Sequence, residues 1–421
     1  MLVRFGNCEL DSERRELRRN AKQVHVQPQV FDLLVYLIDH RDRVISKDQM
    51  VETVWKGRIV SDVTLNSRIN SARHAIGDDG KRQALIRTVP RRGFRFVGDL
   101  VEETAGNGVS AGTPSGETPP QTRATSVAPT QNVTFCRSSD GVNLAVASCG
   151  SGFPIVKTGT WLTHVQHDWD SPVWSPLFQR MAEHFRLVRY DPRGCGLSER
   201  DTACISFEGF VRDLEAVTDS LGLKRFALFG TSQGAAVSIA YAARHPDRVS
   251  HLVLSGGYPL GWNRRGTAAE VATRAALLTL IAHGWGQDNP AFRQVFAARL
   301  WPDTTVEQSR SFDELQRLSA SPENAERIQR VVGDIDVTDL LPLVQTPTLV
   351  LHSRRDATVP RELGLMLAQH IAGARFIEFD SRNHFPLSHE AAWETYVEEI
   401  IGFVAKQDRR LSVASMPIDA E

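Results

Sequence analysis

Apolar residues near the start of the chain recur at the three- and four-residue spacing of amphipathic helices. A first stripe runs from Val30 to Ile38, and a second helix is predicted after Ser46, whose hydroxyl suits an N-cap. A third helix is predicted over 62–76, ending at Gly77. Its buried face consists of residues at spacings of 4, 3 and 4: Leu65, Ile69, Ala72 and Ile76. Short strand-like segments precede these helices, and a hairpin at 85–97 follows them.

After residue 132 strand-like and helix-like segments alternate, which favours a mostly parallel sheet with helices on both faces. Eight strands are predicted, at 133–137, 143–147, 154–158, 186–190, 226–229, 251–254, 348–351 and 375–379. An insertion with helical periodicity, rich in Ala, Leu and Arg, lies between the predicted strands 251–254 and 348–351. It predicts a helical insertion at about 257–341.

A segment of different composition, residues 101–131, separates these two parts. Seventeen of the 31 residues in 101–131 are Gly, Pro, Ser or Thr, and none is aromatic, so this stretch cannot bury enough apolar surface to fold. It predicts a flexible linker with a root-mean-square span of ~30 Å. We therefore expect domains at 1–100 and 132–405 and a tail at 406–421.

Overall composition excludes several classes of protein. The 421 residues are 41% hydrophobic and 24% charged, which is typical of globular proteins rather than collagens, coiled coils or disordered chains. No run approaches the ~20 apolar residues of a membrane span, and the first residues lack a signal-peptide core. Five scattered cysteines without a C-x-x-C pair predict free thiols and a cytoplasmic protein.

Charge is distributed unevenly along the chain. Residues 1–100 hold 19 Lys+Arg and 13 Asp+Glu, a balance of +6. The totals of 49 and 50 leave 30 and 37 for residues 101–421, a balance of −7. A basic segment joined to an acidic body suggests a polyanionic partner for the first part only, although two unrelated surface compositions would look the same.

The third helix and the hairpin are the candidate nucleic-acid interface. Short polar side chains on one helix face permit close approach to a major groove, where arginine reads guanine edges or phosphates; a solvated helix face would have a similar composition. Arginines at an exposed hairpin tip suit a backbone or minor-groove contact. The candidate DNA-contacting residues are Thr64, Ser67, Arg68, Ser71, Arg73, Arg87, Arg91 and Arg92.

Residues 3–98 resemble the OmpR/PhoB-type winged-helix DNA-binding domains. The resemblance rests on Phe31-Asp32-Leu33-Leu34, on Val44-Ile45-Ser46-Lys47 and on the run from Arg87 to Phe96. It implies an α+β winged helix-turn-helix with a recognition helix at 62–76, a wing at 86–97 and double-stranded DNA as partner. It also implies a homodimer on adjacent half-sites. Such regulators usually carry a receiver domain ahead of this module. Here the module opens the sequence, so we expect an input other than aspartyl phosphorylation.

The second domain contains a candidate serine nucleophile. Gly230-Thr231-Ser232-Gln233-Gly234 lies between a predicted strand and a predicted helix, the context in which G-x-S-x-G forms a strained elbow that exposes the serine hydroxyl. A serine needs a base, and the base needs an orienting acid. Asp356 and His384 each follow a predicted strand, which gives the order Ser, Asp, His of a hydrolase triad.

Residues 133–405 resemble the α/β-hydrolase superfamily, and the run Tyr190–Ser198 also matches that family. The resemblance implies that Ser232 is the nucleophile, His384 the general base and Asp356 the orienting acid. It also assigns one oxyanion-hole N–H to Gln233, and it implies that the insertion at about 257–341 forms a helical cap over the nucleophile. Most members have His-Gly after the third strand, whereas this chain has Lys157-Thr158-Gly159, so Trp161 or Thr160 would provide the second N–H.

Other features of this domain leave alternatives open. Aromatic residues of the insertion could line a pocket or pack inside the cap: Tyr258, Trp262, Trp285, Phe296 and Trp301. His164, His167 and Asp168 lie close in sequence, but their loop position does not favour a metal site, and we expect neither a metal nor a cofactor.

The combination predicts a one-component transcriptional regulator with a small-molecule ligand. Its hydrolase-type domain would bind, and in one version also hydrolyse, an ester- or lactone-like compound. The alternative is a serine carboxylic-ester hydrolase with an accessory, autoregulatory DNA-binding module. An architectural DNA-binding protein would not need an elbow serine.

Overall fold

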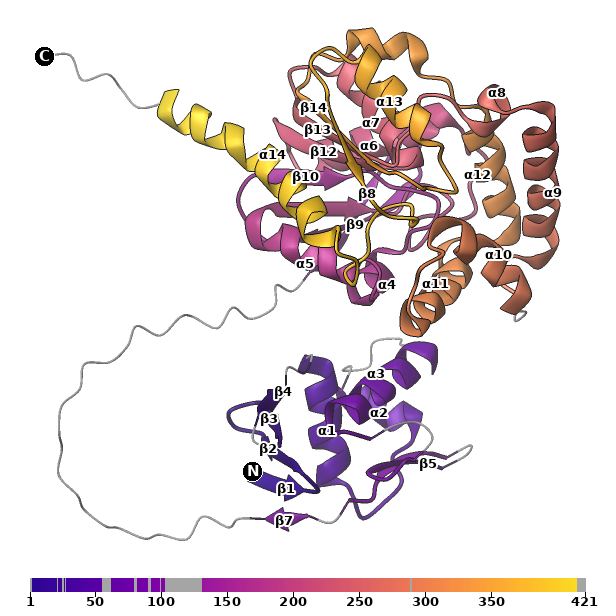
Figure 1. The fold of residues 1–421 in the computed structure, drawn as a ribbon. Helices are drawn as coiled ribbons and strands as arrows, with labels where there is room; N and C mark the ends of the chain where they lie inside the picture. The colour runs from indigo at the N-terminus through magenta and orange to yellow at the C-terminus, as the bar shows by residue number, and fades with distance from the viewer. Residues whose placement is uncertain are drawn as a thin grey trace, which may run out of the picture. The chain divides into compact units, whose positions relative to one another are not determined.

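A computed structural model describes residues 2–20, 22–24, 26, 28–54, 62–78, 82–89, 92–98, 100–102, 131–287 and 290–414 (Figure 1). The chain forms two compact units, Met1–Gln121 and Thr122–Glu421. Most of the predicted linker and the end of the predicted tail lie outside the described ranges. Within those ranges no helix has the length and apolarity to span a membrane. All five cysteines are free thiols.

The first unit is a winged helix-turn-helix domain. Its antiparallel sheet has the order β4-β3-β2-β1-β7, and a separate hairpin pairs β5 with β6. The strands are β1 (Leu2–Phe5), β2 (Cys8–Asp11), β3 (Glu16–Arg19), β4 (Lys22–Val24), β5 (Ile86–Val89), β6 (Gly93–Phe96) and β7 (Val101–Glu102). The helices are α1 (Pro28–Asp39), α2 (Lys47–Val54) and α3 (Asp62–Ala75). This architecture confirms the predicted α+β winged-helix fold.

Local sequence features set the boundaries of these elements. Ser46 Oγ accepts a hydrogen bond from Gln49 N at 3.2 Å, and Gln49 Oε1 accepts one from Ser46 N, so the predicted N-cap of α2 is confirmed. The four residues predicted to form the buried face of α3 are all buried. Gly93 has φ 135°, and a Cβ there would lie 1.9 Å from Ile45 O, so only glycine lets the wing approach the segment that precedes α2.

The second unit contains an eight-stranded sheet in the order β15-β14-β13-β12-β10-β11-β9-β8. Only β9 runs against the direction of the other strands: it pairs antiparallel with β8 and β11, and all other pairs are parallel, which confirms the predicted, mostly parallel sheet. The strands are β8 (Asn132–Arg137), β9 (Asn143–Cys149), β10 (Pro154–Lys157), β11 (Arg186–Tyr190), β12 (Phe226–Thr231), β13 (Val249–Ser255), β14 (Thr348–Ser353) and β15 (Arg375–Phe379).

Helices cover both faces of this sheet. The short α4 (Val165–Asp170) precedes α5 (Ser175–His184), which shares one face with α14 (Trp393–Ala414). The opposite face carries α6 (Phe207–Ser220), α7 (Gln233–Arg244) and α13 (Arg361–His370) (Figure 1). The central strands β12, β13 and β14 are buried along their whole length, because they are covered on both sides.

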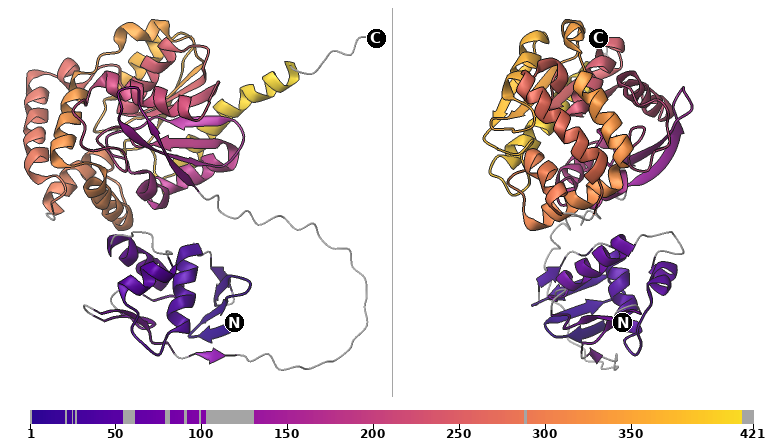
Figure 2. Two further views of the ribbon diagram at one scale, coloured as in Figure 1. Left: turned by 180° about the vertical axis from the view of Figure 1, so that it is seen from behind. Right: turned by 90° about the vertical axis from the view of Figure 1, so that its right-hand side faces the viewer.

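A helical cap is inserted between β13 and β14, at the carboxyl end of β13 (Figure 2). It consists of α8 (Trp262–Arg265), α9 (Ala268–Gly284), α10 (Pro290–Leu300), α11 (Val306–Ser319) and α12 (Pro322–Asp334), followed by a 3-10 turn at Thr338–Leu343. Helix α9 packs on α12, and α10 packs on α11. Capping boxes begin α9 at Thr267 and α11 at Thr305.

Candidate active site

Ser232 lies on a strained turn between β12 and α7. Its φ of 50° and ψ of −123° place a non-glycine residue in a region that costs about 1–3 kcal/mol. A hydrogen bond from Ser232 N to Ser255 O, at 2.9 Å, holds the turn against β13. This strain exposes the hydroxyl, because the side chain leaves the strand at the point where the helix begins.

The two glycines of the motif are required by packing. A Cβ at Gly230 would lie 2.6 Å from Ser238 Oγ and 2.7 Å from Ala235 Cα. A Cβ at Gly234 would lie 3.1 Å from Thr158 O. The first glycine therefore lets the helix turn back tightly on the strand, and the second brings the helix start close to the loop after β10.

His384 and Asp356 form a hydrogen-bonded pair beside this turn. His384 Nδ1 lies 2.6 Å from Asp356 Oδ2, and the two side chains are 3% and 0% exposed. Asp356 Oδ1 accepts hydrogen bonds from the backbone N–H groups of Thr358 and Val359, at 2.8 and 3.1 Å. These bonds fix the carboxylate, which in turn fixes the orientation of the imidazole ring.

The other ring nitrogen of His384, Nε2, is buried. Nε2 has no hydrogen-bond partner among the described residues, Ser232 Oγ included. The ring fits against Gly256, where a Cβ would lie 2.7 Å from Cε1, and the backbone N–H of His384 donates to Leu300 O at 2.7 Å. Catalytic hydrogen bonds are often long in ligand-free enzymes, so this arrangement is compatible with the predicted triad, which stays a prediction.

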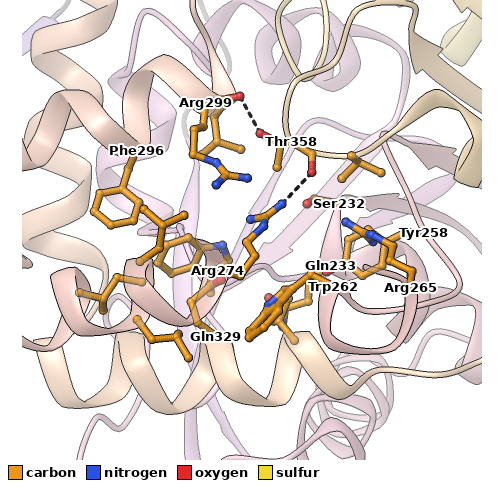
Figure 3. A pocket seen from close by; sticks show the side chains of 17 residues that line it. Ser232, Gln233, Tyr258, Trp262, Arg265, Arg274, Phe296, Arg299, Gln329 and Thr358 are labelled. Atoms are coloured by element: carbon orange, nitrogen blue, oxygen red, sulfur yellow. Dashed lines mark hydrogen bonds between the residues drawn. The ribbon is translucent and has the colours of Figure 1, made fainter. Parts of the chain in front are cut away.

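A pocket of about 750 Å³, its open mouth included, extends from Ser232 into the cap (Figure 3). The aliphatic part of its lining is Leu277, Leu278, Ile281, Leu300, Val332 and Val359. Gln233 and Trp161 also line it, whereas Thr160 does not, so Trp161 is the better placed of the two candidates for the second oxyanion donor. The oxyanion roles remain predictions.

The structure divides the five cap aromatics between the two predicted locations. Tyr258, Trp262 and Phe296 line the pocket. Trp285 and Trp301 pack inside the unit: Trp285 Nε1 donates to Ala320 O, and the Trp301 ring lies edge-on to Phe312 with ring centroids 4.8 Å apart.

Sequence reasoning missed the charged part of this pocket. Three arginines of the cap, Arg265, Arg274 and Arg299, line it together with Gln329 and Thr358 (Figure 3). The only sequence signal was the arginine content of the insertion, which does not tell which arginines face Ser232.

Buried carboxylates position the loop after β10. Asp168 Oδ2 accepts from Thr163 Oγ1 at 3.0 Å, and Asp191 Oδ1 accepts from Val165 N at 3.0 Å. Burial raises the pKa of Asp191 to about 7. His164 Nδ1 caps α4 by accepting from His167 N, and burial lowers the pKa of His164 to about 4.

Within the described residues no group of three His, Cys, Asp or Glu side chains is arranged to hold a metal.

The winged-helix unit presents part of the predicted DNA interface. Ser71, Arg87 and Arg92 are exposed, and Arg68 is half-buried. Arg91 and the side chains of Thr64 and Ser67 lie outside the described residues.

Arg73 differs from the other candidates. It is 4% exposed, and its guanidinium donates to Ile86 O at 2.9 Å and Thr88 Oγ1 at 2.8 Å. These bonds join α3 to β5, so Arg73 holds the wing on the helix instead of facing DNA. We correct the prediction for this residue accordingly.

Comparisons with known proteins agree with both folds. A family model described as alpha/beta hydrolase fold matches residues 163–391, and one described as transcriptional regulatory protein, C terminal, matches residues 21–96. The transcriptional activator CadC of Escherichia coli is 31% identical over 97 residues, which are 23% of this chain and 19% of that protein. The chain thus spans about a fifth of CadC.

The second unit matches other proteins over nearly their full length. The 2-hydroxymuconate semialdehyde hydrolase of Pseudomonas sp. (strain CF600) is 27% identical over 290 residues, covering 64% of this chain and 92% of the relative. The esterase EaEST from Exiguobacterium antarcticum superposes with a TM-score of 0.55 and 24% identity, over 64% of this chain and 98% of the esterase. An enol-lactonase from Burkholderia xenovorans gives a TM-score of 0.54 and 22% identity, over 65% and 100%.

Proposed function

The chain belongs to the α/β hydrolase fold family and joins that fold to an OmpR/PhoB-type DNA-binding domain, and we propose that it is a one-component transcriptional regulator with a serine-hydrolase ligand site. The ligand is a small ester- or lactone-like compound. The observation that carries the proposal is the strained Ser232 at the wall of a cap-covered pocket, beside the hydrogen-bonded pair His384–Asp356.

The proposed chemistry follows from this geometry. Ser232 Oγ attacks the ester carbonyl while Nε2 of His384 takes its proton, and Asp356 stabilises the imidazolium that forms. The backbone N–H groups of Gln233, at the start of α7, and of Trp161 bind the developing oxyanion. The tetrahedral intermediate then collapses: the bond between the carbonyl carbon and the alcohol oxygen breaks, and the alcohol leaves with the proton that His384 holds. Water, with His384 again acting as the base, attacks the acyl-enzyme and releases the acid and free Ser232.

DNA recognition is assigned to α3 and the wing. Thr64, Ser67, Arg68 and Ser71 of α3 read the major groove, and Arg87, Arg91 and Arg92 contact the backbone or the minor groove. We propose that two copies of the chain occupy adjacent half-sites. Ligand binding can change DNA affinity only if the ligand binds the two DNA-affinity states differently.

The regulator proposal predicts that occupation of Ser232 changes the affinity for DNA. Binding of the full chain to a site selected from a random DNA library is measured by fluorescence anisotropy, before and after stoichiometric labelling with a fluorophosphonate. We expect at least ~5-fold different Kd values for labelled and unlabelled protein, the lower end of common allosteric couplings. Ser232→Ala treated with the same reagent is the control and should show no change.

The same measurement separates the two candidate functions. If the selected site binds no more tightly than random DNA, the regulator proposal is wrong. If specific binding is found but labelling leaves it unchanged, the reaction of Ser232 with the label favours the second candidate, a carboxylic-ester hydrolase with an accessory DNA-binding module.

The proposed DNA interface predicts that alanine substitutions in α3 and in the wing lower the affinity for DNA in different ways. Alanine at both Arg91 and Arg92 should weaken specific and random DNA alike and reduce the slope of log K against log salt by about 1–2, because phosphate contacts release counterions. Arg68→Ala should cost about 1–3 kcal/mol on the selected site and relax its sequence preference. Competition titrations with single-base variants of the site test this, and equal losses on all DNAs for both variants would contradict the assignment.

A further inference from the structure

Three arginines from different parts of the cap converge on the nucleophile. Arg265 ends α8, Arg274 lies in α9, and Arg299 lies near the end of α10. All three line the pocket that contains Ser232, and Figure 3 shows their side chains grouped around it. The chain thus concentrates three positive charges at a site whose proposed chemistry, ester cleavage by a serine, needs only neutral donors.

Hydrogen bonds tie two of these arginines to the loops of the triad. Arg274 Nη2 donates to Thr358 O at 3.0 Å, and Thr358 Oγ1 donates to Arg299 O at 2.6 Å. Thr358 also donates its N–H to the carboxylate of Asp356, and the N–H of His384 donates to the carbonyl of Leu300, next to Arg299. These bonds fix the guanidinium of Arg274 and the backbone of Arg299 relative to the loops that carry Asp356 and His384.

These charges have no acidic partner in the described part of the chain. The ion pairs there include none of Arg265, Arg274 and Arg299. Burial and the neighbouring arginines lower the pKa of Arg274 to about 10, and burial lowers the pKa of the other two. The negative charge of Asp356 raises the pKa of all three arginines, but this carboxylate is already hydrogen-bonded to His384. The ligand-free pocket therefore carries an excess of positive charge.

The guanidinium groups differ in how far they are engaged by the protein. Arg265 donates to Leu260 O and lies over the Tyr258 ring, and Arg274 donates to Thr358 O. The guanidinium of Arg299 has no hydrogen-bond partner among the described residues. Since arginine has five N–H donors arranged to match an oxyanion, Arg299 is the group most available to a ligand.

An independent feature of the same wall also points to a polar ligand. Gln233 is 1% exposed and lines the pocket, yet neither Oε1 nor Nε2 has a hydrogen-bond partner among the described residues. A buried amide without partners is costly, and such groups are normally satisfied by protein, water or ligand.

We infer that the ligand of this pocket carries an anionic oxygen group, a carboxylate or a phosphate, which Arg299 and Arg274 bind while its ester or lactone carbonyl lies at Ser232. The inference rests on the proposed function, because it takes Ser232 as the reacting end of the pocket. The hydrocarbon part of the ligand packs against Leu278, Ile281 and Phe296. Neutral esters of the same length lack the group that balances the arginines and are poorer substrates.

The first test compares two matched substrates of the full chain. Mono(4-nitrophenyl) glutarate and 4-nitrophenyl valerate have the same acyl length and differ by the terminal carboxylate. We expect kcat/KM to be at least ~10-fold higher for the glutarate, and Arg299→Gln to lower that ratio roughly 10- to 100-fold, the range of a lost hydrogen bond to a charged group. Arg299→Lys should restore part of the ratio because it keeps the charge.

The matched control is Arg264→Gln, an exposed arginine of α8 that does not line the pocket. It should leave both rates and their ratio unchanged. Equal rates for the two esters in the wild-type chain, or a ratio that Arg299→Gln leaves intact, would overturn the inference. Hydrolysis of the valerate that depends on Ser232 would nevertheless leave the proposed chemistry standing.

A second readout does not need turnover. Calorimetric titration of the Ser232→Ala chain with glutarate, propyl phosphate and neutral glutaramide, at one ionic strength, measures anion binding alone. We expect at least one anion to bind more tightly than glutaramide and to lose roughly 10- to 100-fold in Arg299→Gln; the tighter anion distinguishes carboxylate from phosphate. If neither anion is preferred, the inference is wrong. If anions bind but no ester is cleaved, the anion site stands and the proposed catalysis fails.

Discussion

Ser232→Ala is expected to lower kcat for a 4-nitrophenyl ester by about 10⁶-fold, the loss found when a triad serine is removed. In the proposed mechanism the hydroxyl oxygen of Ser232, on the turn between β12 and α7, forms the acyl-enzyme, and alanine has no such oxygen. The fold should survive, because alanine keeps the Cβ and the backbone bond to Ser255 O is unaffected. The amount of product formed over several hours measures the loss of kcat, and a thermal melt measures whether the fold survives.

A background reaction has to be separated from this result. Cys204 is an exposed free thiol, and thiolates cleave activated esters without any active site. Cys204→Ser in the wild-type chain should therefore leave kcat unchanged, whereas Cys204→Ser combined with Ser232→Ala should remove any residual rate. A Ser232→Ala chain that retains more than a hundredth of the activity would mean that another residue is the nucleophile.

The candidate triad was predictable because each member occupies a position that sequence patterns mark. Ser232 lies between a buried strand and an Ala-rich helix, and Asp356 and His384 each follow a strand-like run. Parallel strands bring their carboxyl ends to one edge of the sheet, so residues far apart in sequence meet there. Packing then explains details that no pattern shows, such as the close contact between Gly256 and the His384 ring.

The cap arginines could not be predicted in the same way. Helices α9 and α10 are rich in alanine, leucine and arginine, and α9 has no strongly one-sided apolar face. Which side of such a helix faces the pocket depends on how the cap docks over Ser232, and that docking is set by distant contacts such as Arg274 with Thr358. A helical pattern gives the element, but not its rotation against the sheet.

The spacing of Arg73 from apolar residues of the third helix indicated a buried position, although we predicted a DNA contact for it. It lies four residues after Ile69 and three before Ile76, on the same side of α3 as these buried residues. Its charge suggested the DNA-facing side. The carbonyl of Ile86 and the hydroxyl of Thr88 satisfy the guanidinium inside the domain, which is why a charged residue is stable at a buried position.

Asp356→Asn is expected to lower kcat by about 10⁴-fold with little loss of stability, the effect of changing the tautomer of a triad histidine. The backbone N–H groups of Thr358 and Val359 require an acceptor, so the asparagine oxygen will face them and its NH₂ group will face His384. Nδ1 must then accept, the proton moves to Nε2, and His384 can no longer take the proton of Ser232.

His352 cannot compensate for this substitution. Its Nε2 lies 3.8 Å from Asp356 Oδ2, but the ring is bonded to Val359 O, and burial lowers its pKa, which keeps it neutral. Asp380→Asn is the matched control, because Asp380 is an exposed carboxylate paired with Arg355 on the same edge of the sheet. Rates measured from pH 6 to 10 should stay below those of the wild-type chain for Asp356→Asn, since hydroxide can take the serine proton at high pH but does not restore the tautomer. Activity within tenfold of the wild-type chain would show instead that His384 is oriented by its fit against Gly256 alone.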